Sequence, residues 1–175
     1  GFPLDVAKRL IEDLIGGLRP TDSFDVILFS GASVLWSPRS LPANRENVKK
    51  AIALVERQRG GGGTELLPAL QQAMSLPRAG GTSRSFIVIT DGGISDGRGM
   101  FEYIRDHVGD ANVFSFGIGS SVNRYLVDGV AKAGMGEAFV VTSASEAPPV
   151  AEAFRRYVSA PVLTGIRVTY DGFDA

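Results

Sequence analysis

Hydrophobic residues recur along much of this chain at the spacing of amphipathic helices. In residues 2–18, apolar side chains lie three or four positions apart and charged side chains fill the other face, with Ala7, Leu10, Ile11, Leu14, Ile15 and Leu18 on the apolar stripe. Asn44 is placed to cap a second such helix over 44–59, and Asn123 and Ser145 are placed to cap later ones. We therefore expect helices over 2–18, 44–59, 65–75, 99–108, 124–133 and from Ser145 to about Val158.

Short apolar runs rich in β-branched and aromatic residues separate these helices. They predict strands over 24–30, 85–90, 112–118 and 138–142, the first two of them buried, and residues 34–36 can form a short extension paired with the first. Strands that alternate with helices favour a parallel sheet covered on both faces. The expected class is therefore α/β, with a doubly wound, mostly parallel sheet of the Rossmann-like kind.

The run over 85–90 carries the most informative chemistry, because it ends in Thr90-Asp91 and two glycines then turn the chain. A carboxylate at the carboxyl end of a buried strand lies where open α/β sheets bind ligands. Earlier in the chain, four glycines at 60–63 precede Thr64, which is either a helix cap or a ligand. Hydroxyl and carboxylate oxygens suit Mg²⁺, Mn²⁺ or Ca²⁺, but two oxygen ligands do not complete an octahedral site.

Composition excludes several classes of protein. Of the 175 residues, 44% are apolar and 21% charged, as in one globular domain. The 18 Lys and Arg balance 19 Asp and Glu without a basic cluster, which argues against nucleic-acid binding. Cysteine is absent, so disulfides and thiolate sites are excluded. No apolar run approaches the ~20 residues of a membrane span. The chain begins without Met, so we expect an excised fragment.

Other possible motifs are incomplete. The glycine loop lacks the Gly-Lys-Ser/Thr ending of a phosphate-binding loop. Gly117-Ile118-Gly119 lacks the third glycine of a dinucleotide fingerprint and is interpreted as a structural turn. His107, the only histidine, is interpreted as a surface or helix-end residue, and Asp96 as a turn residue.

Taken together, these stretches resemble a von Willebrand factor type A (VWA) domain, closest to that of inter-alpha-trypsin inhibitor heavy chains and their bacterial relatives. The matching residues are 1–8 (GFPLDVAK), 25–30 (DVILFS), 62–70 (GGTELLPAL), 89–92 (ITDG), 116–124 (FGIGSSVNR) and 161–164 (PVLT). They cover nearly the whole chain in the family's order.

The resemblance implies a metal-ion-dependent adhesion site at the carboxyl end of the sheet. In the family, one loop carries Asp-x-Ser-x-Ser, a second a Thr and a third an Asp; the second corresponds to Thr64 and the third to Asp91. The first loop and the central first strand before it have no counterpart here, since the chain begins at the stretch that follows them. We therefore expect weak or absent ion binding by this chain, and an empty central slot between the strands at 24–30 and 85–90.

The leading functional hypothesis is a non-enzymatic interaction or adhesion module that binds a carboxylate of a partner protein through Mg²⁺, Ca²⁺ or Mn²⁺. The alternatives are a metal-dependent hydrolase using Asp91 and a scaffold that no longer binds metal. The empty slot also allows strand exchange or self-association. Residues 1–160 are expected to form the VWA domain, and 161–175 a strand or linker that leaves the core toward a following region. The family resemblance favours a bacterial cell envelope or an extracellular location.

Overall fold

The computed structural model describes residues 2–29, 33–59, 65–78, 80–91 and 97–159. Its helices are α1 (Phe2–Gly16), α2 (Arg45–Glu56), α3 (Leu66–Ser75), α4 (Arg98–His107), α5 (Arg124–Ala133) and α6 (Ala147–Ser159), with a 3-10 turn (Ala144–Glu146) before α6. Its strands are β1 (Ser23–Phe24), β2 (Ile27–Phe29), β3 (Ser33–Leu35), β4 (Leu41–Pro42), β5 (Ser85–Thr90), β6 (Asn112–Ile118) and β7 (Ala138–Val141).

The central sheet of the described residues consists of β5, β6 and β7, which run parallel with β6 in the middle. The register pairs Ser85 with Asn112 and continues to Thr90 with Gly117. Two antiparallel pairs, β2–β3 and β1–β4, form separate sheets. The predicted alternation of helices with parallel strands is therefore confirmed.

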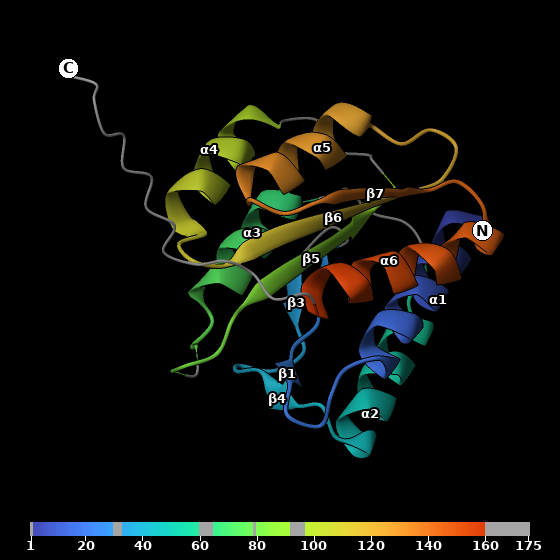
Figure 1. Ribbon diagram of the computed structural model, residues 1–175, viewed down its shortest axis with the longest axis vertical. Helices are drawn as coiled ribbons and strands as arrows, with labels where there is room; N and C mark the ends of the chain where they lie inside the picture. The colour runs from blue at the N-terminus through green and yellow to red at the C-terminus, as the bar shows by residue number, and fades with distance from the viewer. Residues whose placement is uncertain (1, 30–32, 60–64, 79, 92–96, 160–175) are drawn as a thin grey trace, which may run out of the picture.

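Helices cover both faces of this sheet and bury two hydrophobic clusters. Figure 1 shows α4 and α5 on one side of the sheet and α1 and α6 on the other. The first cluster joins α3, α4 and α5 to the sheet around Leu66, Leu70, Val88, Ile104, Val113 and Val130. The second joins α1 and α6 to it around Val6, Leu10, Phe114, Phe116, Val141 and Phe154. Burial of these apolar stripes accounts for the helical periodicity of the sequence.

Two of the three predicted helix caps are confirmed. The side chain of Asn44 accepts a hydrogen bond from the Asn47 amide (2.8 Å), and that of Asn123 from the Leu126 amide (3.2 Å). The expected cap at Ser145 is wrong, because this residue lies inside the 3-10 turn and α6 begins at Ala147. The prolines that follow fit the first turn of α6, where backbone amides have no helical acceptor.

The prediction of one buried strand over 24–30 is wrong in part. The chain forms β1 and β2 instead, and Asp25 between them accepts a hydrogen bond from the amide of the adjacent Val26 (2.7 Å). Strand β2 is half-buried rather than buried, and it pairs with β3 from Ile27↔Leu35 to Phe29↔Ser33. The predicted pairing with the 34–36 segment is thus confirmed.

Strand β5 was expected to be buried on both faces, and it is not. Of its six residues only Val88 and Thr90 are buried, and the side chain of Ile87 is 40% exposed. Within the described part of the chain, β5 is an outermost strand of its sheet and β2 pairs only with β3. The expected empty slot between β5 and β2 stays a prediction. The expected exit of residues 161–175 from the core lies outside the described residues.

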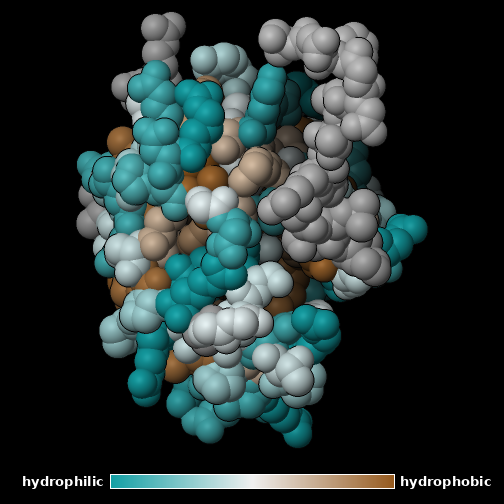
Figure 2. Space-filling model, turned by 60° about the vertical axis from the view of Figure 1, so that its left-hand side comes forward, coloured by the Kyte–Doolittle hydropathy of each residue, from teal (hydrophilic) through white to brown (hydrophobic). Residues whose placement is uncertain are grey.

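Some hydrophobic side chains remain at the surface, including Val34, Ile87, Tyr125, Met135, Tyr157 and Val158. Figure 2 shows one face on which hydrophilic residues predominate and hydrophobic residues appear near the middle. None of the described helices has the length and apolar character that crossing a membrane requires.

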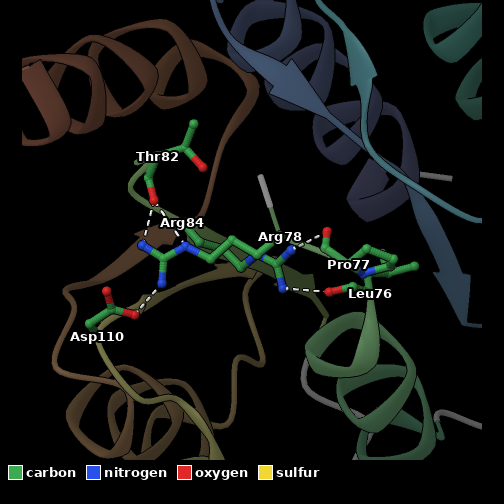
Figure 3. Close-up of polar contacts among 6 residues, drawn as sticks. All are labelled: Leu76, Pro77, Arg78, Thr82, Arg84 and Asp110. Carbon is green, nitrogen blue, oxygen red and sulfur yellow. Dashed lines mark hydrogen bonds and ion pairs between the residues drawn. The ribbon is translucent and has the colours of Figure 1, made fainter. Parts of the chain in front are cut away.

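Two arginines stabilise the connection between α3 and β5 (Figure 3). One binds backbone carbonyl groups at the start of this connection, and the other binds the turn before β6. The guanidinium of Arg84 donates to the carbonyl oxygens of Leu76 (2.9 Å) and Pro77 (2.7 Å). Arg78 forms an ion pair with Asp110, and its hydrogen bond lowers the pKa of that carboxyl group. Arg84 is the more buried of the two arginines, so its contacts are expected to contribute more to stability.

Replacing Arg84 with alanine should lower the free energy of unfolding by about 1–3 kcal/mol, because two carbonyl groups lose a charged donor. The measurement is urea unfolding followed by circular dichroism. Asp110→Ala is the control and should have a smaller effect, because its carboxylate is exposed. Equal unfolding midpoints for the two variants would contradict this assignment.

Asp25 carries a buried carboxylate oxygen. Its Oδ2 has no hydrogen-bond partner among the described residues, and burial raises the pKa of this carboxyl group. A raised folded-state pKa means that the folded protein holds this proton more tightly than the unfolded chain does. The resulting stabilisation is fully present below the unfolded pKa of about 3.9, and is lost as the pH rises through the folded-state pKa.

We therefore expect Asp25→Asn to be more stable than the wild type at neutral pH, because the amide removes a buried charge. The difference in the free energy of unfolding should shrink as the pH falls through the raised folded-state pKa of Asp25, and it should reach its smallest value below about 4, where the carboxyl is neutral in both states. Urea unfolding of both proteins across this pH range measures it. A difference that does not change with pH would show that the charge of Asp25 is not the cause.

Candidate functional site

Asp91 lies directly after β5, at the carboxyl end of the central sheet, and its side chain is exposed. The register places it level with the end of β6, because Thr90 pairs with Gly117. Strand β7 ends at the same place, because Ile118 pairs with Val141. The predicted position of Asp91 at the carboxyl end of a strand is confirmed, and its role as a metal ligand stays a prediction.

Several helices begin at this end of the sheet. Helices α4, α5 and α6 each follow a strand that ends there. The N-terminal turn of α1 is also close, since a Cβ atom added to Gly119 would lie 3.7 Å from Cγ of Pro3. Each helix N-terminus carries a partial positive charge and free amide groups. Together they favour negative charge at this end, either on the protein or on an approaching ligand.

Next to β7, Glu146 binds back to the end of the strand. Its carboxylate accepts hydrogen bonds from the amide (2.7 Å) and the hydroxyl (3.0 Å) of Thr142, which lower the pKa of the Glu146 carboxyl. The hydroxyls of Ser143 and Ser145 lie 3.0 Å apart in the same turn. Sequence reasoning missed this arrangement, although the Thr-x-x-x-Glu spacing of one helical turn was a usable signal.

A shallow pocket of about 380 Å³ lies between α1 and this turn, lined by Asp5, Val6, Arg9 and Ala144. Its walls carry one exposed acid and one exposed base on α1, over the buried side chain of Val6. The opposite charges offset each other, so this pocket alone selects no class of ligand.

Thr64, the predicted companion of Asp91, lies outside the described residues, as do the loops 60–63 and 92–96. Helix α3 has Glu65 at its cap position, without a side-chain hydrogen bond. No group of three or more His, Cys, Asp or Glu within the described ranges could hold a metal ion. Asp91 fits a hard divalent ion by its oxygen chemistry, but a complete site needs ligands from beyond those ranges.

Two weaker candidates are resolved by their surroundings. His107 is exposed at the end of α4, where its ring stacks on Tyr103 and its Nδ1 lies 2.9 Å from the Tyr103 carbonyl oxygen. It is a surface residue, as predicted. The turn expected over 117–119 is wrong in part, because Gly117 and Ile118 belong to β6. A Cβ atom on Gly117 would lie 2.4 Å from Cγ1 of Val122, so close packing requires this glycine.

Sequence reasoning also missed Tyr125 in the first turn of α5. Its side chain is 69% exposed, and its ring meets Phe101 edge-on with 5.6 Å between ring centres. The apolar stripe of α5 predicts that the adjacent Leu126 and Val127 are buried, which they are. That stripe does not indicate that the exposed ring of Tyr125 packs against Phe101 of α4.

Known proteins provide an independent comparison. The chain is 31% identical over 134 residues to a von Willebrand factor A domain-containing protein of Dictyostelium discoideum, covering 76% of this chain and 15% of that protein. It is 29% identical over 154 residues to von Willebrand factor A domain-containing protein 5B1 of Mus musculus, covering 87% of this chain and 13% of that protein. The chain thus spans only a small part of these relatives.

Solved structures support the same fold. A von Willebrand factor type A protein from Catenulispora acidiphila superposes with a TM-score of 0.76 at 22% identity, covering 89% of this chain and 37% of that one. Manganese-loaded TRAP protein of Plasmodium vivax gives 0.67 at 16% identity, covering 88% and 67%. Residues 2–140 match the von Willebrand factor type A domain family. The chain therefore belongs to this family.

Proposed function

We propose that this chain is a non-enzymatic interaction module that binds an acidic group of a partner protein through a divalent cation at the carboxyl end of its sheet. The observation that carries the proposal is the exposed carboxylate of Asp91 at that end, where the strands that precede α4 and α5 also end. A cation at Asp91 would leave coordination positions for a partner's carboxylate, and the nearby helix N-termini favour that negative charge.

The names of two solved structures with a similar fold mention a bound metal. One is the manganese-loaded TRAP protein. The other is proximal thread matrix protein 1 of the mussel byssus with a zinc-occupied MIDAS motif, with a TM-score of 0.66 at 14% identity over 88% of this chain and 40% of that one. For this chain we propose Mg²⁺, Mn²⁺ or Ca²⁺, with Asp91 and Thr64 among the ligands. Since two protein oxygens leave most of an octahedral shell to water, we expect weak binding.

Mn²⁺ binding tests this function directly. Electron paramagnetic resonance measures the free Mn²⁺ that remains as protein is added. We expect one weak site, lost in Asp91→Asn and in Thr64→Ala but retained in Asp5→Asn, which removes an exposed carboxylate from α1. Equal binding by wild type and Asp91→Asn would overturn the proposal. No binding at all would favour a scaffold that no longer holds metal.

The alternative enzymatic function is metal-dependent hydrolysis that uses Asp91. Such chemistry usually needs a base or a charge clamp. The only histidine, His107, is the last residue of α4, whereas Asp91 precedes the first turn of that helix. Phosphatase and esterase assays with Mg²⁺ distinguish the two functions. Turnover that Asp91→Asn abolishes would favour the enzyme over the interaction module.

We also propose that two copies of the chain self-associate by strand exchange, in which the open edge of β5 pairs with an extended segment of the second copy. Strand β5 is uncharged along its six residues and is an outermost strand of the described sheet. Such an edge readily pairs with another extended segment. Sedimentation velocity should therefore show dimers at high protein concentration, and Ile87→Lys should reduce them. A chain that stays monomeric at all concentrations would contradict this proposal.

A further inference from the structure

Tyr125 has an unusual combination of exposure and support. Its side chain is 69% exposed, compared with 46% for Tyr157, the other exposed tyrosine of the described helices. Its ring nevertheless has a fixed neighbour, because it meets the ring of Phe101 edge-on at 63°, with 5.6 Å between ring centres. Edge-to-face geometry of this kind is a favoured aromatic contact. The tyrosine ring is therefore exposed to solvent and also held in one orientation by its contact with Phe101.

Tight packing around its tip holds the supporting ring in place. Phe101 is 9% exposed, and a Cβ atom on Gly129 would lie only 2.2 Å from its Cζ. A Cβ atom on Gly97 would lie 3.0 Å from the same atom. Glycine is unfavourable inside a helix, and at position 129 it makes the room that this ring needs. Phe101 thus forms a rigid platform between α4 and α5.

This platform borders the end of the sheet that carries Asp91. Phe101 lies in the first turn of α4, which follows the loop after Asp91, and Tyr125 lies in the first turn of α5, which follows β6. Arg124 is exposed beside Tyr125, whereas Asp128 is one helical turn further along α5. The first turn of α5 therefore combines an aromatic ring, a guanidinium group and a helix N-terminus.

We infer that Tyr125 and Arg124 form a docking surface for a partner protein segment in which an aromatic side chain lies next to an acidic residue. The inference rests on the proposed function, in which that acid reaches the cation at Asp91. Tyr and Arg are the residue types that most often dominate binding energy in protein interfaces. A pre-ordered tyrosine loses little conformational entropy on binding, so it suits the contact with the partner's aromatic ring.

The test uses three blocked dipeptides as probes: acetyl-Asp-Phe-amide, acetyl-Asp-Ala-amide and acetyl-Asn-Phe-amide. Each is titrated into ¹⁵N-labelled protein with and without Mg²⁺, and amide chemical shifts are followed at 97–101 and 124–126. We expect acetyl-Asp-Phe-amide to shift these signals and to bind more tightly than either other probe. Tyr125→Ala should weaken its binding about fivefold, the effect of losing one aromatic contact, and leave acetyl-Asp-Ala-amide unchanged.

Tyr157→Ala is the matched control. Tyr157 is also an exposed tyrosine, and it meets the buried Phe114 edge-on at 5.5 Å, but it lies in the last turn of α6. This variant should bind all three probes like the wild type. Equal binding of the Phe and Ala probes, an equal effect of the two tyrosine variants, or no shift at 97–101 and 124–126 would overturn the docking surface. Phe-probe binding that requires Tyr125 but not Mg²⁺ would support the surface and count against the cation.

Discussion

Replacing Phe116 with alanine is expected to lower the free energy of unfolding by about 3–5 kcal/mol, which is a large part of the stability of a typical domain. The ring is fully buried in the middle strand of the sheet. It stacks on Phe139 with 4.9 Å between ring centres and meets Phe154 edge-on at 5.6 Å. Truncation would leave a cavity that these neighbours, fixed on β7 and α6, cannot fill.

Urea unfolding followed by circular dichroism measures this effect, with Tyr125→Ala as the control. Tyr125 is exposed and loses one edge-on contact, so its change should stay below about 1.5 kcal/mol. The control also shows that the variant used to test the docking surface remains folded. Similar losses for both aromatic variants would mean that Phe116 is not at the centre of the core.

Gly136→Ala is the second large effect, with an expected loss of about 1–3 kcal/mol or more. This glycine lies in the turn between α5 and β7, where its amide donates to the Ala131 carbonyl (2.9 Å). A Cβ atom there would lie 2.2 Å from the carbonyl oxygen and 2.8 Å from the carbonyl carbon of Val113. Both atoms are backbone of β6, which β5 and β7 hold on either side. The clash therefore cannot be relieved by a side-chain rotation.

Gly99→Ala provides the matched control, because this glycine lies in α4 and a Cβ atom there would meet nothing within 4 Å. Alanine favours a helix over glycine, so Gly99→Ala should raise the free energy of unfolding by up to about 1 kcal/mol. Opposite signs for the two variants in the same unfolding assay are the expected outcome. Destabilisation by both would show that the space around these glycines is not the deciding factor.

The sequence predicts much of this fold because local rules and tertiary packing agree. The apolar stripes of the helices become the buried faces, and Asn44 and Asn123 cap where their chemistry allows. Asp91 was found because few positions combine a strand end, a carboxylate and a following glycine pair. Its partner Thr64 stays a prediction, since it lies outside the described residues.

Features that depend on neighbouring strands were not predictable from local patterns. An apolar run indicates that a strand can be buried, but whether each side chain is buried depends on what packs over its face of the sheet. On the outermost strand β5, Val88 is buried whereas Ile87, which points to the opposite face, is exposed despite its hydrophobicity. The run at 24–30 breaks because Asp25 binds the next backbone amide, an alternative that competes with a regular strand.

The display of Tyr125 depends on residues that are distant in the sequence. The ring of Phe101 comes from α4, and the space that it fills is left by Gly129 of α5. The sequence of either helix alone does not indicate that these two residues meet. The helical period of α5 identifies what is buried, which leaves an exposed tyrosine indistinguishable from any other surface residue. Only the packing of α4 on α5 shows that the ring of Tyr125 is held by a neighbour, unlike that of an ordinary surface residue.

The most direct test of the central claim is to locate bound Mn²⁺ by the paramagnetic broadening of amide signals in ¹⁵N-labelled protein. We predict that the broadening is centred on Thr90, Asp91 and Gly117–Gly119, at the carboxyl end of the sheet, and that Asp91→Asn removes it. Broadening centred instead on the acidic groups near α1 and β7, such as Asp5 or Glu146, would contradict the claim that Asp91 holds the ion.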